Sequence, residues 1–190
     1  LPLIKELASR IGLIRLVKQL FKTNDHTQCR IHKDPDNLMQ LVYQIIASYF
    51  EDNCADELTN DPVMTAILDK EALASQPTLS RFWNRMDGDT LSQLDMIQSK
   101  LRDIIYSVQK PEHMLFDLDS TLLNTYGMQE GEGFNYHYQG HGYHPLFCYD
   151  GLTGDLLKAE LRDGTQYCSK DADQFMIPLM QEYRSKVNGK

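Results

Sequence analysis

The sequence predicts a mixed α/β fold in which an all-helical region of about 110 residues precedes a strand-rich region. Up to about Lys110, apolar residues recur at three- and four-residue steps, as they do on the buried face of a helix. After Pro111, short apolar runs are bounded by glycine and acidic residues, which is typical of strands and tight turns. With 42% apolar residues in 190, the chain can bury the core of one large domain or two small ones. We therefore expect two domains, residues 1–110 and 111–190.

The helices of the first region are predicted from apolar stripes and capping signals. One stripe runs from Ile4 to Phe21 and predicts a first helix over this span. Asp61-Pro62 predicts a helix start, because Asp accepts hydrogen bonds from free N–H groups and Pro suits the first turn. Further helices are expected over about 36–49, within 75–85 and over about 89–108.

The second region predicts three antiparallel strands followed by a helix. The apolar run His113–Asp119 ends in acidic residues, as a buried strand does when its tip reaches a site. Pro145–Tyr149 and Leu156–Leu161 flank a turn that contains glycine, which predicts a hairpin. The stretch 127–143, rich in glycine and aromatic residues, is expected to be a polar loop, and a helix follows Asp171.

The sequence contains no segment that predicts a membrane span. No apolar stretch approaches the roughly 20 residues that cross a bilayer, and no signal-peptide pattern is present. The cysteines show no C-x-x-C spacing, which argues against a zinc ribbon or a disulfide framework. We therefore expect a cytoplasmic protein that does not bind a membrane.

Basic residues are concentrated at the start of the chain, although the formal net charge is −8. The first 33 residues carry seven Lys and Arg against two acidic residues, so this segment can neutralise DNA phosphates or form a solvated helix face. The segment Ser75–Arg85 is compatible with a helix-turn-helix element and with an amphipathic core helix. The side chains expected to contact DNA are Arg15, Lys18, Lys22, Arg81 and Arg85.

The strongest local signal is the acidic strand end Asp117-Leu118-Asp119-Ser120-Thr121. Alternation along a strand places both carboxylates on one face. The segment resembles the first motif of haloacid-dehalogenase-like phosphatases, in which Asp117 would be the nucleophile and Asp119 the general acid and base, with magnesium. The elements predicted after this segment do not fit that family, because a hairpin follows instead of the strand-to-helix alternation of a parallel sheet.

The chain resembles the DDE (Asp-Asp-Glu) transposases of bacterial insertion sequences over essentially its whole length. Several separate segments carry this resemblance in the same order, which makes it more specific than one acidic pentapeptide. Besides residues 117–121, they are 49–53, 61–62, 73–82, 125–127, 129–131, 144–146 and 159–164.

This resemblance implies a ribonuclease-H-like catalytic core, of which residues 111–190 would be the first part. It implies DNA cleavage and strand transfer at the ends of a mobile element, with two Mg²⁺ or Mn²⁺ ions held between three carboxylates. Asp119 matches the first catalytic aspartate, and Asp117 either supports it or is itself the ligand. The partners implied are double-stranded DNA, as terminal repeats and target, and a second copy of the full-length protein.

The second Asp and the Glu of that family have no counterpart in residues 1–190. The chain also begins at Leu1 instead of Met. We therefore expect a fragment that is catalytically incomplete, or a truncated relic that only binds DNA.

Three histidines, His137, His141 and His144, have spacings that suit zinc on a helix, but the glycines among them disfavour a helix. We expect instead a loop that touches the DNA backbone near the active site, with His144 at the entry to the second strand.

Overall fold

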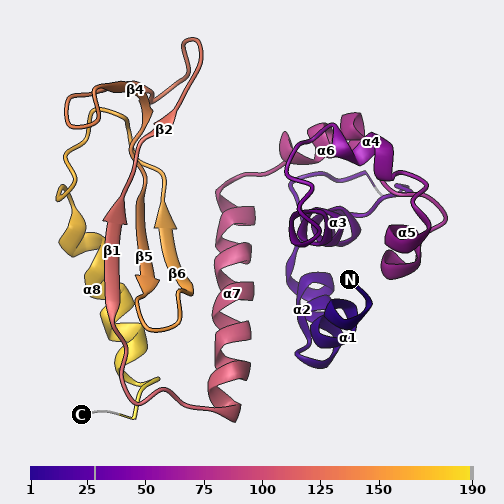
Figure 1. The fold of residues 1–190 in the computed structure, drawn as a ribbon, viewed down its shortest axis with the longest axis horizontal. Helices are drawn as coiled ribbons and strands as arrows, with labels where there is room; N and C mark the ends of the chain where they lie inside the picture. Colours follow the sequence, from indigo (N-terminus) through magenta and orange to yellow (C-terminus); the bar gives the residue numbers. More distant parts are fainter. Residues whose placement is uncertain (28, 189–190) are drawn as a thin grey trace. The chain divides into compact units, whose positions relative to one another are not determined.

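The computed structural model describes residues 1–27 and 29–188, which form two compact units, Leu1–Ile105 and Tyr106–Lys190 (Figure 1). Within these described residues there are eight helices and two antiparallel sheets of three strands each, so the mixed α/β class is confirmed. None of the helices is long and apolar enough to cross a membrane over the part of the chain described.

The first unit is all-helical. Its short helices begin with prolines or capping residues, as at α5, where Asp61 Oδ1 accepts hydrogen bonds from the N–H groups of Val63 (2.9 Å) and Met64 (2.7 Å). Helix α3 contacts α2, α5 and α6, and its Tyr43 is buried in the core of the unit. The helices are α1 (Pro2–Arg10), α2 (Leu13–Leu20), α3 (Asp34–Ile46), α4 (Cys54–Leu58), α5 (Pro62–Leu68), α6 (Gln76–Trp83) and α7 (Gly88–Val108), whose last three residues belong to the second unit.

The helix predicted over 4–21 is interrupted at Gly12. This residue has φ +79°, in the left-handed region where a side chain is strained, and it separates α1 from α2. The apolar stripe continues across the break, since Ile4, Ile14 and Val17 all pack in the same core. The continuous apolar stripe therefore predicted the buried face correctly, but it did not reveal the bend between α1 and α2 at Gly12.

A cluster of five polar residues joins the segment after α2 to the end of α6. Asp34 is buried, and its carboxylate accepts hydrogen bonds from the N–H (3.0 Å) and hydroxyl (2.8 Å) of Thr23. The same carboxylate pairs with Arg30 (2.6 Å) and Arg85 (3.3 Å), and both arginines also pair with Asp25, at 3.0 and 3.6 Å. This ionic cluster fixes the loop between α2 and α3.

The ionic cluster lowers the pKa of Asp34 below its ordinary value of 3.8. Burial alone raises the pKa of this carboxyl, but the two hydrogen bonds from Thr23 and the charges of Arg30 and Arg85 outweigh burial. The ionised form is therefore the one that the fold stabilises.

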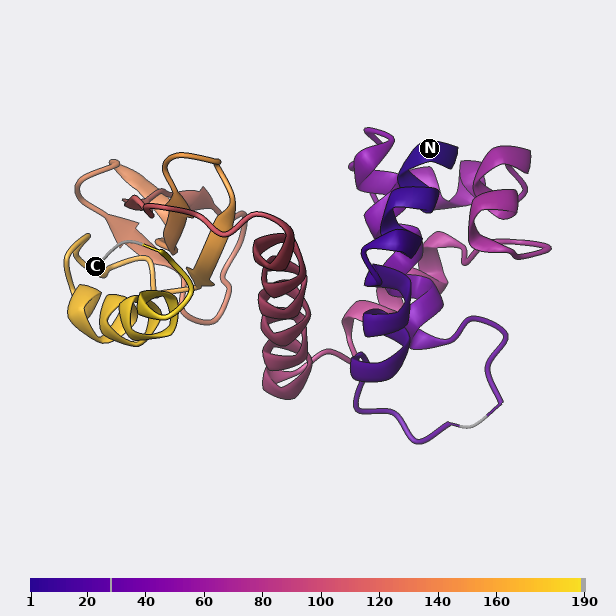
Figure 2. The same ribbon diagram turned by 90° about the horizontal axis from the view of Figure 1, so that it is seen from below.

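The second unit is built on an antiparallel sheet of order β1-β5-β6, formed by β1 (Phe116–Ser120), β5 (Leu146–Asp150) and β6 (Leu156–Glu160). Helix α8 (Ala172–Arg184) covers one face of this sheet (Figure 2). Cys148 from β5 and Phe175 and Tyr183 from α8 are buried in the core between them. The predicted three antiparallel strands and following helix are therefore present.

A second small sheet forms where the sequence predicted a polar loop. Strands β2 (Leu123–Asn124), β4 (Gly140–Tyr143) and β3 (Gly133–Asn135) pair antiparallel in the order β2-β4-β3. A Cβ atom at Gly142 would collide with the carbonyl of Leu123, so glycine allows the close approach of β2 and β4. The prediction of a loop was wrong, because these glycines disfavour a helix but permit tightly packed short strands.

We predict that Asp34→Asn lowers the free energy of unfolding by about 3 kcal/mol at pH 7, because it removes the buried negative charge between two partly buried arginines, which then keep only Asp25 as an ion-pair partner. The folded-state pKa of Asp34 is lowered, so its contribution is complete above pH 3.8 and is lost as the pH falls through that lower pKa. Urea unfolding at several pH values measures both effects. Glu6→Gln, in the exposed Glu6–Arg10 pair, is the control and should cost less than about 0.5 kcal/mol. Equal losses in the two variants would contradict the prediction.

Candidate active site at the end of strand β1

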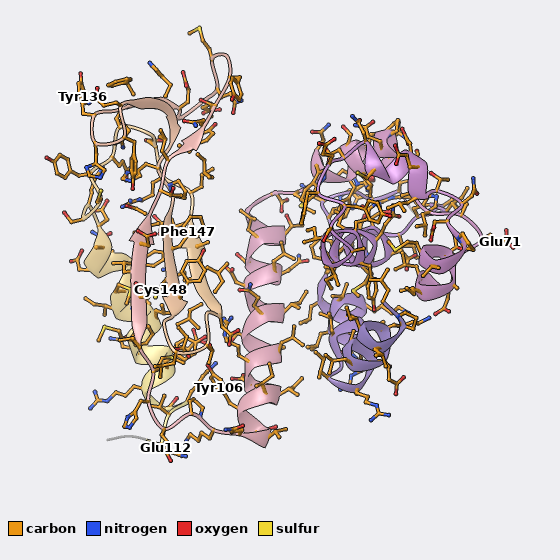
Figure 3. All side chains as sticks on the ribbon, in the orientation of Figure 1. Glu71, Tyr106, Glu112, Tyr136, Phe147 and Cys148 are labelled. Carbon is orange, nitrogen blue, oxygen red and sulfur yellow. The ribbon has the colours of Figure 1, made fainter. Side chains whose placement is uncertain are left out.

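Asp117 and Asp119 are exposed side chains of β1, an edge strand of the larger sheet. Asp117 lies opposite Tyr149 and Asp119 opposite Phe147 in the register with β5 (Figure 3 labels Phe147). Both therefore lie on one face, whereas Phe116 packs with α8 on the other. The pairing with β5 fixes the backbone that carries both carboxylates on one face, as the sequence predicted. The prediction of a buried strand was wrong, because β1 lies at the edge of the sheet and none of its residues is buried.

Asp119 borders a hollow with a volume of about 410 Å³ at the end of β1. The wall of this hollow comes from four parts of the second unit: the end of β1, the turn between β3 and β4, the start of β5, and the segment that leads into α8 together with the first residue of that helix. The side chains of His137, Tyr138 and Ser169 are among its lining residues. Asp119 Oδ1 accepts a hydrogen bond from the N–H of Ser120 (2.8 Å), so the second carboxylate oxygen remains available to a ligand.

Tyr138 ties the turn of the small sheet to the strand that carries Asp119. Its hydroxyl donates a hydrogen bond to the carbonyl of Ser120 at 2.6 Å. Asn135 shapes the turn, because its side-chain oxygen accepts hydrogen bonds from the N–H groups of His137 (3.0 Å) and Tyr138 (3.3 Å). The end of β1 is thus held from the small sheet as well as from β5.

Arg162 holds the segment that forms the opposite wall of the hollow. This residue is 5% exposed, and its guanidinium donates hydrogen bonds to the carbonyls of His144 (3.0 Å), Lys170 (3.1 Å) and Cys168 (3.3 Å). The main chains of His144 and Arg162 are also joined by an N–H to carbonyl bond of 3.1 Å. One buried cation therefore sets the path of residues 167–170.

His144, which the sequence placed among the DNA contacts, is fully buried. Its Nδ1 lies 2.8 Å from the carbonyl of Gln166, which can only accept, so Nδ1 carries the proton. Nε2 faces Cys168 Sγ at 3.9 Å, and the ring packs edge-on against Tyr138. The His144 ring therefore offers no exposed atom to DNA in this structure and acts at the entry to β5, the other role the sequence suggested.

Three of the candidate DNA contacts lie together on or just after α2. Arg15, Lys18 and Lys22 are exposed at spacings of three and four residues, and their side chains have no ion-pair partner within the described residues. Arg81 on α6 is also exposed, with a weak hydrogen bond to Thr78 Oγ1 (3.4 Å). Arg85 differs, because it belongs to the ionic cluster around Asp34 and is occupied there.

The carboxylates Asp117 and Asp119 suit a hard cation such as Mg²⁺ by their chemistry. Within residues 1–27 and 29–188, however, no group of three or more His, Cys, Asp or Glu side chains is placed to hold a metal ion. Cys148 cannot contribute a thiolate at neutral pH, because burial and the nearby charges of Asp117 and Asp150 raise its pKa to about 11. The described residues thus supply part of a metal site and do not complete one.

Asp117 and Asp119 are two exposed carboxylates on an edge strand, and Asp119 borders a hollow; carboxylates have the chemistry to bind a cation or to transfer a proton. Comparison with family models gives the particular family: the model described as Transposase DDE domain group 1 matches residues 1–190, and the chain belongs to this family. It is therefore a transposase domain, from a class of enzymes that act on DNA and generally use divalent metal ions. Comparisons with curated proteins and with solved structures gave no match.

Sequence reasoning missed Tyr138 and Arg162. The only signal for Tyr138 was Asn135, a residue type that favours turns and that here positions the following N–H groups. Arg162 follows the strand β6 in a Leu-Arg-Asp-Gly turn, and nothing in that pattern indicates that the guanidinium is buried. Both donate to backbone carbonyls 6 to 18 residues away, in segments outside their own turn, and local sequence patterns do not encode such contacts.

We predict that Tyr138→Phe loosens the end of β1, because it removes the hydrogen bond to Ser120 while keeping the ring. Amide hydrogen exchange over residues 119–122 should accelerate by up to about fivefold, as expected for the loss of one hydrogen bond of about 1 kcal/mol. The matched control is Tyr136→Phe, since the Tyr136 hydroxyl has no hydrogen-bond partner in the described part of the chain. Unchanged exchange in the Tyr138 variant would show that this bond does not restrain the strand.

Proposed function

We propose that residues 111–190 are the first part of a ribonuclease-H-like catalytic domain and that residues 1–110 are a DNA-binding region of the same transposase. The observation that carries the catalytic part is the position of Asp119, at the end of the first of three antiparallel strands that a helix follows. This order is the one with which ribonuclease-H-like folds begin. The reaction we propose is DNA cleavage and strand transfer at the ends of an insertion sequence.

Asp119 is the proposed first catalytic carboxylate and a ligand for Mg²⁺ or Mn²⁺. In this class of enzyme, paired ions activate the attacking oxygen and stabilise the leaving oxygen of a phosphodiester. Three contacts position the Asp119 carboxylate. Strand β5 fixes the backbone of β1, the Tyr138 hydroxyl restrains the carbonyl of Ser120, and the N–H of Ser120 orients one Asp119 oxygen. Asp117 lies on the same face, two residues away, as a supporting or alternative ligand.

We further propose that residues 1–190 are catalytically incomplete by themselves. The family holds two ions between three carboxylates, and the second Asp and the Glu of that set are not recognisable in this sequence. Activity would then require carboxylates that residues 1–190 do not contribute, in a full-length protein that we expect to act as a homodimer. A relic that binds DNA without cleaving it is the non-enzymatic form of the same proposal.

The phosphatase alternative, with Asp117 as nucleophile, gains no support. Its motif belongs at the end of a strand in a parallel sheet with alternating helices, whereas β1 pairs antiparallel with β5 and β5 with β6.

The DNA-binding part of the proposal rests on Arg15 and Lys18 of α2 and on Lys22, two residues after the helix. In this proposal these three exposed side chains act as one row of cations that binds the phosphate backbone of double-stranded DNA. Arg81 is a further proposed contact. We do not assign this role to Arg85, whose guanidinium is paired with Asp34 and Asp25.

We predict that the chain binds duplex DNA with an affinity that falls steeply with salt. The triple variant Arg15/Lys18/Lys22→Ala should reduce the slope of log K against log salt by about 2 to 3, because three phosphate contacts no longer release counterions. Fluorescence anisotropy over a salt series measures this slope. The control variant Lys100/Lys110/Arg184→Ala removes the same charge from other exposed positions and should leave the slope unchanged. Binding that is insensitive to salt would refute the proposed DNA contacts.

We predict that Mn²⁺ binds weakly at the end of β1 and that Asp119→Asn abolishes this binding. Mn²⁺ broadens the NMR signals of nearby nuclei, so the backbone amides of residues 117–121 should lose intensity in the wild type and keep it in the variant. Asp155→Asn, at an exposed carboxylate in the β5–β6 turn, is the matched control and should retain the broadening. Broadening that survives Asp119→Asn but disappears in Asp117→Asn would transfer the ligand role to Asp117.

A further inference from the structure

A second hollow lies next to the one at Asp119. It has a volume of about 450 Å³, and it shares the lining residues His137, Cys168 and Ser169 with the hollow at Asp119. Two tyrosines, Tyr136 and Tyr167, contribute to its wall, and each is 82% exposed. Figure 3 shows Tyr136 at the opposite end of the second unit from Glu112. The two hollows are therefore adjacent, with the carboxylate of Asp119 on the wall of one and a pair of aromatic side chains on the wall of the other.

The chemistry of this second hollow differs from that of an ion site. No Lys, Arg, Asp or Glu is among its lining residues, which are aromatic or neutral and polar except for His137. The side chains of Thr165 and Gln166 have no hydrogen-bond partner among the described residues. Aromatic faces with unoccupied donors and acceptors at the edge suit a flat, neutral ring that carries hydrogen-bonding groups. A phosphate or an acidic peptide would find no cation here.

The ring of Tyr136 has an aromatic neighbour on its own strand-to-turn segment. It packs edge-on against Phe134, with centroids 5.1 Å apart, and Phe134 in turn contacts the ring of His141 at 5.2 Å. This contact restricts the Tyr136 ring on one side, which reduces the conformational entropy that the ring loses on binding a ligand.

We propose that the hollow between Tyr136 and Tyr167 binds an unpaired nucleobase of the DNA strand whose phosphate lies at Asp119. This rests on the proposed function, since it takes DNA as the substrate and Asp119 as the catalytic residue of the adjacent hollow. The shared wall places the two hollows side by side, as the base and phosphate of one nucleotide, or of adjacent nucleotides, require. Stacking on tyrosine accepts any base, so the pocket selects unpaired strands without selecting a sequence.

The test compares two labelled duplexes of equal paired length, one blunt and one with a short unpaired overhang, by fluorescence anisotropy. The wild-type chain should bind the overhang duplex about tenfold more tightly, and Tyr136→Ala/Tyr167→Ala should remove this preference without changing the affinity for the blunt duplex. A fluorescent adenine analogue in the overhang should be quenched by the wild type and not by the variant.

Two controls separate stacking from other effects. Tyr126→Ala removes a tyrosine that is 90% exposed but does not line the hollow, and it should keep the preference. An overhang of abasic nucleotides keeps the phosphates and should bind no better than the blunt duplex. Equal binding of abasic and normal overhangs, or an equal loss in the Tyr126 variant, would overturn the proposal.

The test of the pocket can be separated from the test of the proposed DNA contacts at Arg15, Lys18 and Lys22. The proposed row of cations is tested by the blunt duplex and its salt dependence, whereas the pocket is tested by the ratio of the two affinities. A chain that binds the overhang through Tyr136 and Tyr167 but ignores blunt DNA would support the pocket and refute the row. A chain that binds both duplexes equally would support the row of cations and refute the pocket.

Discussion

The antiparallel pairing of β1 with β5 determines where the residues of the candidate site lie. It sets Asp119 opposite Phe147 and Asp117 opposite Tyr149, so the two carboxylates share a face and the apolar side chains on the other face pack against α8. A shift of one residue would exchange the two faces and bury the carboxylates. The core between the sheet and α8 therefore specifies the register, and through it the exposure of Asp117 and Asp119.

The acidic side chains Asp34 and Asp119 differ in burial and in the number of their partners. In the first unit, Asp34 is buried, paired with two arginines and held in its ionised form, and this immobilises a loop. In the second unit, Asp119 is exposed and has one hydrogen bond from its neighbour, which leaves it free to act on a ligand. Arg85 shows why position matters more than residue type, since it looks like a DNA contact in the sequence and is a structural partner of Asp34.

The sequence predicted the elements with strong periodicity and could not predict contacts between distant segments. Helix α7 and the strands β1, β5 and β6 follow from apolar patterns. The burial predicted for β1 did not follow, because this strand lies at the sheet edge and carries Asp117 and Asp119 exposed. The break between α1 and α2 at Gly12 was not predicted, because one glycine does not interrupt an apolar stripe. The small sheet was missed because two- and three-residue strands depend on their partners more than on their own pattern. Tyr138 and Arg162 bind carbonyls 18 or fewer residues away that no local motif identifies.

The Arg162 guanidinium donates hydrogen bonds to the main-chain carbonyls of Tyr167, Cys168 and Lys170, and none of these bonds involves a side chain of that segment. These bonds consequently do not depend on which side chains residues 167–170 carry. A replacement of the exposed Tyr167 leaves its carbonyl available to Arg162, so the main-chain wall of the hollow that Tyr167 lines does not require tyrosine at this position. The outline of that wall and the chemistry of the side chain on it are thus set by different atoms.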